Sequence, residues 1–180
     1  MVGAVLLVLL AVLGVTILRI GQLLWLHLFL GLVLLGPLAL KMASVGYRFV
    51  RYYARVPAYR EKGPPKTVMR LIAPLVLATT LTVFVSGIVL LIHGPRGRGD
   101  LVLVHKASFV IWLGVIALHV LGHLPIMVRV LRPGSSRSLS GVAGRRIALV
   151  GAIAGGLVTA IALIPDFAAW TAHAALHHHR

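Results

Sequence analysis

Hydrophobic residues fall in five long stretches along the chain, and short segments between them hold nearly all the charged residues. Each stretch has about 17–24 residues, and about 20 apolar residues rising 1.5 Å each cross the ~30 Å hydrocarbon core of a bilayer. Backbone groups in lipid must be satisfied within their own segment, so the pattern predicts helices. The predicted spans are 2–18, 22–40, 71–93, 101–124 and 147–164.

The fold class follows from this pattern. The short alternating segments expected of a membrane β-barrel do not occur in the sequence. We therefore expect an all-α fold, in which residues 1–180 form a single membrane domain, an integral bundle of five transmembrane helices. The first stretch could also be a signal peptide, but no basic residues precede it and no clear small-residue cleavage site follows it. It is therefore expected to remain as a helix.

Composition supports a membrane protein over a soluble one. Apolar residues make up 59% of the 180 residues and charged residues 12%, whereas soluble domains have roughly 45–50% and about 25%. The 18 basic and 3 acidic residues give a net charge of +15. Such a charge is also typical of nucleic-acid binding, but the apolar content favours lipid as the partner and no nucleic acid. The chain has no Cys, which excludes disulfides and iron–sulfur clusters.

Basic residues also predict the orientation. They concentrate in the loops 41–70 and 125–146, which should therefore be cytoplasmic. We expect an integral protein of a bacterial plasma membrane, with its N-terminus in the cytoplasm and its C-terminus outside. The second helix should continue past the membrane as far as Pro57, with arginines and aromatics suited to anionic lipid or to a partner protein. The tail after Pro165 is expected on the outer surface.

Acidic residues lie outside the predicted spans. Glu61, Asp100 and Asp166 all fall in the predicted loops or in the tail. Ion-coupled transporters and proton pumps usually need a carboxylate inside the membrane, so this class is disfavoured. A membrane reductase would need a cytosolic electron source, and the chain has no flavin or dinucleotide fingerprint. Any enzymatic activity would therefore be shared with a partner.

Histidines are the ionisable residues that remain within the spans. His27 and His105 lie near the predicted outer ends of the second and fourth spans, and His119 and His123 lie towards the inner end of the fourth. His105 and His119 are about 14 residues apart, which is ~21 Å of rise and within roughly 40° of the same helix face. Neutral imidazole is a good axial ligand for haem iron. The sequence therefore predicts a haem held by His27 and His105, from two different helices.

Other residues suit the same site. Gly31 lies one turn from His27 and leaves room for a flat macrocycle, because glycine has no Cβ. Arg19, Arg96 and Arg98 lie at the predicted outer rim, where guanidinium groups could bind haem propionates. His93, at the membrane edge, is the weakest histidine candidate.

Two motifs carry a family resemblance. They are LHLFLG around His27 and HKASFVIWLGVIALHVLGH from His105 to His123. The chain resembles the transmembrane b-type cytochromes of the cytochrome b561-like and formate dehydrogenase gamma-subunit group. The resemblance implies a four-helix haem-binding core, haem b, and paired histidine ligands on different helices. It also implies electron transfer between a quinone pool, or another redox partner protein, and an acceptor.

The sequence departs from the two-haem members of that group. At the inner level it offers only His119 and His123, which lie on one helix and cannot easily hold both faces of one porphyrin. A second haem would need another ligand, such as Met42 opposite His119, so we expect one haem and leave a second open. His119 and His123 could otherwise ligate a five-coordinate haem, contact quinone or hydrogen-bond between helices.

The competing interpretation is a non-redox membrane anchor or an assembly subunit of a larger complex. Each histidine taken alone is more typical of hydrogen-bonded packing, and the histidines of the tail are typical of a solvated segment. In the fifth span, Gly151 and Gly155 have the spacing of a small-residue packing face. Absorbance of the purified protein would separate the cytochrome from the anchor.

Overall fold

The computed structural model describes residues 2–57, 67–95, 99–131 and 142–177, and these ranges are helical apart from short turns. No strand occurs in them, so the all-α prediction is confirmed. The helices are α1 (Val2–Leu18), α2 (Ile20–Tyr53), α4 (Thr67–His93), α5 (Gly99–Leu131), α6 (Val142–Ala162) and α7 (Ile164–His177).

Four of the helices are long and apolar enough to cross a membrane. They contain the segments Ile20–Tyr53, Leu71–His93, Gly99–Leu124 and Ala143–Ala162. The remaining predicted span, α1, has 17 residues, the lower end of the range of about 17–25 that spans a bilayer. Many large apolar side chains face outwards, such as Ile147 at 72% and Val158 at 66% exposed. Contiguous exposure of this kind suits lipid rather than water.

The chain forms two compact units, which are described separately. Unit 1 comprises Met1–Val50, Leu90–Arg98 and Gly141–Arg180. Unit 2 comprises Arg51–Val89 and Gly99–Ser140.

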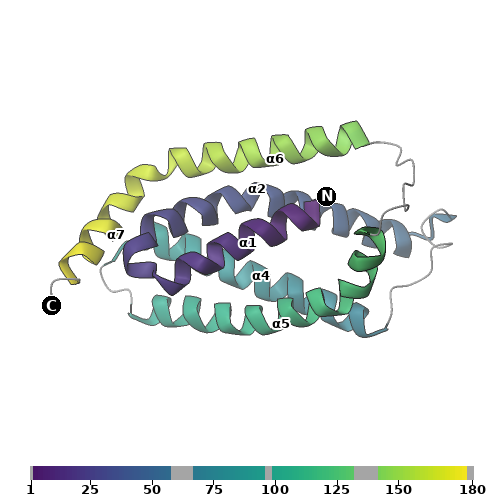
Figure 1. Cartoon of the computed structure of the whole chain (residues 1–180), viewed down its shortest axis with the longest axis horizontal. Coiled ribbons are helices and arrows are strands. Elements are labelled where there is room, and N and C mark those ends of the chain that lie inside the picture. The colour runs from purple at the N-terminus through teal and green to yellow at the C-terminus, as the bar shows by residue number, and fades with distance from the viewer. Residues whose placement is uncertain (1, 58–66, 96–98, 132–141, 178–180) are drawn as a thin grey trace. The chain divides into compact units, whose positions relative to one another are not determined.

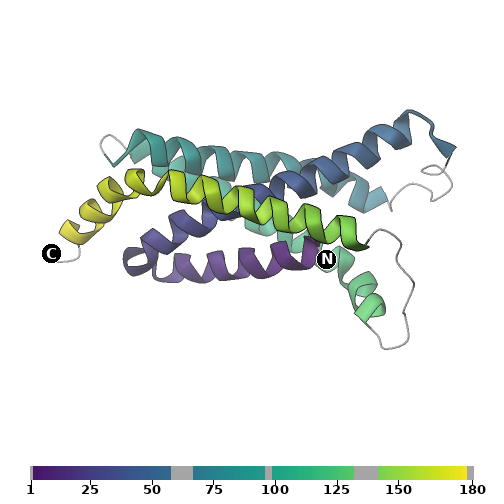
Figure 2. The ribbon, with the colours of Figure 1, turned by 90° about the horizontal axis from the view of Figure 1, so that it is seen from above.

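In unit 1, α1 and α2 form a tight antiparallel hairpin (Figures 1 and 2). The carbonyl of Arg19 accepts hydrogen bonds from the backbone N–H groups of Gln22 and Leu23, at 3.0 and 2.9 Å. Leu23 leaves the helical region at φ −109° and ψ 17°, so the chain reverses almost without a loop. Far from the turn, a Cβ at Gly3 would lie 3.9 Å from Lys41 Nζ, which shows that α1 runs along most of α2.

The helices α2 and α6 cross at two glycines. A Cβ at Gly36 would overlap the carbonyl oxygen of Ala152, and a Cβ at Gly156 would overlap that of Val33. Pro37 lies inside α2 and has no N–H, so it cannot bond the Val33 carbonyl that Gly156 approaches. Close backbone approach with Cα–H···O contacts is a usual way of packing helices in membranes. The two contacts also show that α6 runs antiparallel to α2.

This crossing corrects the predicted packing face of the fifth span. Gly151 and Gly155 are exposed, and no atom lies within 4 Å of the position of a Cβ on either. The buried stripe is shifted by one residue, to Ala152, Gly156 and Ala160. The prediction was wrong because several small residues are adjacent here, and their spacing alone does not tell which row faces α2.

After α6 the chain breaks at Leu163 and continues as α7. The sequence predicted only a surface tail here, but Phe167 is 1% and Trp170 7% exposed. Phe167 packs its edge against Trp25 of α2, with ring centroids 5.9 Å apart. Trp170 Nε1 donates to the carbonyl of Leu91 at 3.3 Å. Pro95, four residues after Leu91, has no N–H to offer that carbonyl, so α7 satisfies a backbone group that α4 leaves open.

Replacing Trp170 by Phe should destabilise unit 1 by about 1 kcal/mol, because the Leu91 carbonyl loses its donor while most of the ring packing stays. Thermal unfolding of the detergent-solubilised protein, followed by circular dichroism, measures the change. The exposed Trp25→Phe substitution is the control for loss of an indole. An unchanged melting temperature for Trp170→Phe would contradict this role.

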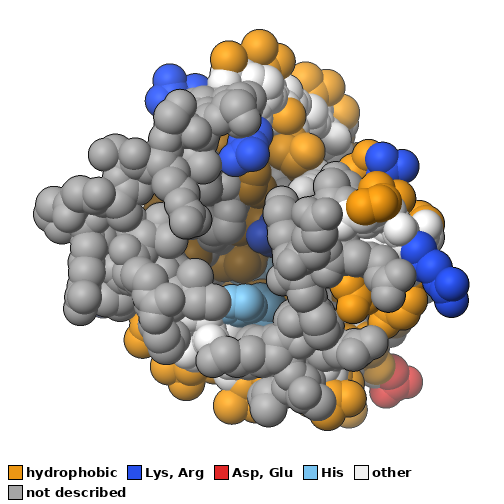
Figure 3. All heavy atoms as spheres, turned by 90° about the vertical axis from the view of Figure 1, so that its right-hand side faces the viewer, with side chains coloured by type: hydrophobic (Ala, Val, Ile, Leu, Met, Phe, Trp, Pro, Cys, Tyr) orange, Lys and Arg blue, Asp and Glu red, His pale blue; other side chains and the backbone are white. Residues whose placement is uncertain are grey.

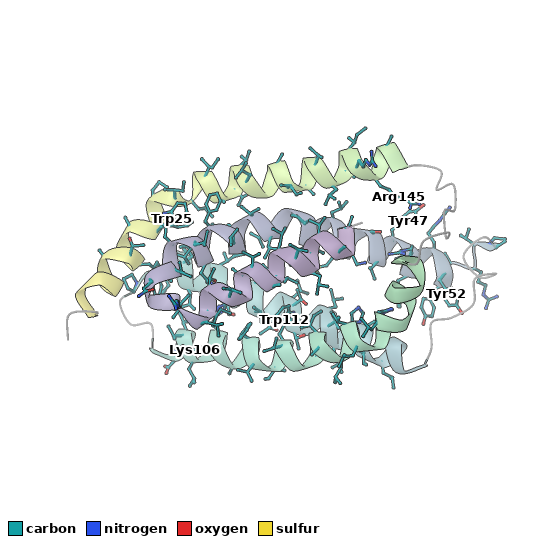
Figure 4. The ribbon with its side chains drawn as sticks, viewed as in Figure 1. Trp25, Tyr47, Tyr52, Lys106, Trp112 and Arg145 are labelled. Atoms are coloured by element: carbon teal, nitrogen blue, oxygen red, sulfur yellow. The ribbon has the colours of Figure 1, made fainter. Side chains whose placement is uncertain are left out.

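In unit 2, α4 and α5 form a second antiparallel hairpin with polar contacts between its helices. The indole Nε1 of Trp112 donates to Thr80 Oγ1 at 3.0 Å, and both side chains are buried. Ser108 is also buried, and its hydroxyl donates to the carbonyl of His105 at 2.9 Å. Figure 4 labels Trp112 on α5. Buried hydroxyls and an indole therefore fix how α5 packs on α4.

The extension of the second helix is confirmed. α2 has 34 residues, which is about 51 Å of rise and much longer than the ~30 Å hydrocarbon core. The helix ends at Tyr53, and Arg55, two residues later, has a left-handed backbone conformation with φ 60°. The N–H groups of Arg55 and Val56 bond the carbonyls of Tyr52 and Arg51, which is a Schellman closure before Pro57.

Candidate functional site

His27 is held within the α1–α2 hairpin of unit 1. Its Nδ1 lies 2.9 Å from Oγ1 of Thr16, which is 2% exposed. The Thr16 hydroxyl donates its only hydrogen to the carbonyl of Leu13, one turn back on α1. It can therefore only accept from His27, so Nδ1 carries the proton and Nε2 is the unprotonated ring nitrogen.

His105 is held in the same way within the α4–α5 hairpin of unit 2. Its Nδ1 lies 2.9 Å from Oγ of Ser86. The Ser86 hydroxyl donates to the carbonyl of Val83 at 3.0 Å, so it too accepts from the imidazole. The hydroxyl of Ser108 lies 3.5 Å from that of Ser86 and closes a small polar cluster. His105 is therefore also an Nδ1–H tautomer with Nε2 as an acceptor or ligand atom.

The two hairpins thus repeat one arrangement. In each, a hydroxyl on the earlier helix, already bonded to the carbonyl three residues back, accepts from the Nδ1–H of a histidine on the later helix. Histidines that ligate metals through one ring nitrogen usually donate from the other, which fixes the tautomer and the ring orientation. In both hairpins the hydrogen bond from Nδ1–H therefore makes Nε2 the unprotonated ring nitrogen.

Two glycines differ in what lies beside them. A Cβ at Gly87 would lie 3.1 Å from Cε1 of His105, so this glycine lets the imidazole lie close against α4. Gly31, the glycine singled out from the sequence, has no atom within 4 Å of the position of a Cβ, so the space beside it is open. The sequence prediction that Gly31 leaves room is compatible with that space, and Gly87 was missed.

His119 and His123 lie one turn apart on α5 and contact each other. Their ring centroids are 4.6 Å apart and their planes meet at 61°, an edge-to-face contact. Both side chains are partly buried. A five-coordinate haem, a quinone contact and hydrogen bonds between helices all stay predictions for this pair.

The structure describes one of the three arginines that were predicted to bind haem propionates. Arg19 is exposed at the α1–α2 turn, where its backbone carbonyl closes the hairpin. Arg96 and Arg98 lie outside the described residues. His93 is exposed at the end of α4. The side chains of the tail histidines lie outside what the structure describes.

His27 belongs to unit 1 and His105 to unit 2. Their sharing of one iron therefore stays a prediction from the sequence. A metal site made by protein alone needs three or more His, Asp or Glu side chains close together. The described residues contain no such group. A haem iron takes only its axial ligands from the protein, so a haem needs no such group.

The sequence analysis missed Thr16, Ser86 and Gly87. A signal for two of them exists in the chain, because the helices of a tight hairpin pair residues that lie at equal distances from the turn. Thr16 lies about three residues before Arg19, where the first turn begins, and His27 about four residues after Leu23, where it ends. Ser86 lies about seven residues before the end of α4, and His105 about six residues after the start of α5. Looking for hydroxyls opposite the histidines across each turn would have found both.

Comparison of the chain with protein-family models, curated proteins and solved structures finds no match.

Proposed function

We propose that this protein is a membrane b-type cytochrome that transfers electrons between a quinone pool, or another redox partner, and an acceptor. The observation that carries the proposal is the pair of histidines whose Nδ1 atoms are each 2.9 Å from a back-bonded hydroxyl. Hydroxyls that fix the tautomer of two histidines, the buried Thr16 and the half-buried Ser86 of apolar helices, suit a ligand role for Nε2.

The donor set fits haem b rather than a hydrated metal ion. Two neutral imidazoles in an apolar surrounding would suit a low-spin haem b. Among the described residues, no carboxylate lies in the four helices long enough to cross a membrane beyond the first turn of α5. His27 is about seven residues from the start of α2, and His105 about six from the start of α5. Both imidazoles therefore lie about 10 Å inside their helices, as the predicted shared haem requires.

The residues of the chain would divide the work. His27 and His105 would hold the iron through Nε2, while Thr16 and Ser86 keep each ring in one tautomer and orientation. Bound haem supplies one-electron chemistry, and the axial ligands and burial set its potential. The apolar helices exclude water from the site. Of the three arginines predicted to bind haem propionates, Arg19 at the α1–α2 turn is the one that the structure describes.

The proposal is tested by the absorption of the purified protein in detergent. We expect a Soret band and, on reduction, resolved alpha and beta bands, with one haem per chain by pigment extraction. Protein expressed with ample haem that shows no Soret band would refute the cytochrome. It would leave the membrane anchor or assembly subunit as the interpretation.

Removing the hydroxyls should weaken haem binding without abolishing it. Thr16→Val keeps the side-chain shape, and Ser86→Ala removes only the oxygen, so each takes away the hydroxyl that accepts from an Nδ1–H. Loss of such partners typically costs about 10–100-fold in metal affinity. The weaker donation to iron should also raise the reduction potential. Redox titration measures the shift, with Thr82→Val as the control, because Thr82 is exposed and its hydroxyl donates to the carbonyl of Ala78 on its own helix. Unchanged affinity and potential in both hydroxyl variants would contradict this role.

A further inference from the structure

Four cations lie towards one end of unit 1, and we call this set the basic end. Lys41 and Arg48 come from α2, and Arg145 and Arg146 from α6. The three arginines are exposed and Lys41 is half-buried. Arg48 Nε donates to the carbonyl of Ser44 at 3.1 Å, which aligns its guanidinium with its own helix.

The crossing of α2 and α6 brings Lys41 and Arg145 to a similar level, and Arg48 lies on the same side, about 12 residues or roughly 18 Å past Gly36 along α2. Lys41 is about five residues past Gly36 on α2, and Arg145 about seven residues before Ala152 on α6. Because the helices are antiparallel, both lie on the same side of the crossing, roughly 8–10 Å along the helix axes. Figure 4 shows Tyr47 and Arg145 at this same end.

The basic end marks the edge of the apolar surface on both helices. On α2 the predicted apolar span ends just before Lys41, and on α6 it begins at Ile147, directly after Arg146. Beyond this edge α2 exposes two aromatic residues, Tyr47 at 57% and Phe49 at 62%. Cations and amphipathic aromatic rings are both typical of the headgroup region of a bilayer. Figure 3, which views this end, shows Lys and Arg side chains among hydrophobic ones.

Acidic residues do not balance this charge within unit 1. The residues of unit 1 include a single acid, Asp166, in the first turn of α7. Asp166 is about 20 residues from Arg146, which is about 30 Å along the chain of helices. We propose that the basic end binds the phosphate groups of anionic lipids, such as phosphatidylglycerol. This inference is independent of the haem.

The test uses the full chain in detergent, titrated with phosphatidylglycerol or phosphatidylcholine and followed by native mass spectrometry. In the variant Arg48→Gln/Arg145→Gln/Arg146→Gln, affinity for phosphatidylglycerol should fall by roughly fivefold per cation, about a hundredfold in all. The exposed Lys106 belongs to unit 2, so Lys106→Gln is the matched control and should change affinity less than twofold. Replacing the same three arginines by Lys should retain binding. Circular dichroism shows whether each variant keeps its helices.

Three results would overturn the proposal. The first is equal affinity for phosphatidylglycerol in the wild type and the triple Gln variant. The second is binding of phosphatidylcholine as tightly as phosphatidylglycerol. The third is displacement of phosphatidylglycerol by inorganic phosphate or by a polyglutamate peptide at lower concentration, which would assign the surface to a soluble anion or to an acidic protein. If the triple Gln variant unfolds, the single variant Arg145→Glu replaces it. Loss of phosphatidylglycerol binding in this variant, with its helices intact, would support the proposal, and unchanged binding would overturn it.

Discussion

His27→Ala and His105→Ala should each abolish the low-spin haem spectrum. Under the proposal, removing either imidazole would take away one of the two ligands of the haem iron, and a methyl group cannot replace it. The resolved alpha and beta bands of the reduced protein should disappear, and the pigment retained per chain should fall by more than about tenfold. Reduced-minus-oxidised difference spectra of the purified variants, at equal protein concentration, measure both effects.

The matched control is His93→Ala, because His93 is exposed at the end of α4 and should leave the spectrum unchanged. A low-spin spectrum retained in both His27→Ala and His105→Ala would refute these ligands. If only one variant loses the spectrum, the predicted pairing of His27 with His105 is wrong. His119→Ala and His123→Ala then identify whether the partner lies on α5, and the number of haems per chain separates one site from two.

Gly36→Ala and Gly156→Ala should each destabilise the protein more than any other small-residue change in unit 1. The added Cβ would overlap a backbone carbonyl, of Ala152 or of Val33, and a backbone cannot turn aside as a side chain can. The helices must separate, and overpacking of this kind costs about 2–3 kcal/mol. For a chain of this length the melting temperature should fall by roughly 5–10 °C. Thermal unfolding in detergent, followed by circular dichroism, measures the fall.

Gly151→Ala and Gly155→Ala are the matched controls on the same helix. Nothing lies within 4 Å of a Cβ at either position, and alanine favours a helix over glycine by up to about 1 kcal/mol. Their melting temperatures should therefore stay the same or rise. If all four substitutions had the same effect, the close crossing of α2 and α6 at Gly36 and Gly156 would be contradicted.

Much of the fold could be predicted from the sequence because lipid restricts the choice of structure. The predicted spans match the helices within a few residues, except where α2, α4 and α5 extend beyond the apolar segments. Pro37 and Pro74 lie inside the predicted spans 22–40 and 71–93, and each lies within a helix of the structure. The helix α7 was not predicted, because its polar and aromatic residues lack the length and the hydropathy of a span.

The candidate site was only half predictable. His27, His105, His119 and His123 were found because ionisable residues are conspicuous among apolar ones. Their hydroxyl partners were not found, since serines and threonines occur on all faces of these helices and most bond only to their own backbone. Only the hairpins showed that Thr16 and Ser86 differ from Thr79, Thr82 and Thr159.

The sequence by itself determined that this is an all-helical chain whose long apolar helices suit a bilayer, and it determined the level of each histidine along its helix. The tertiary structure decided which face of each helix packs inwards. A helix that is apolar all round has no hydrophobic stripe to mark its buried face. The buried face is set instead by the fit of the backbones, at Gly36 with Ala152 and Gly156 with Val33, and by hydrogen bonds such as that of Ser86 with His105.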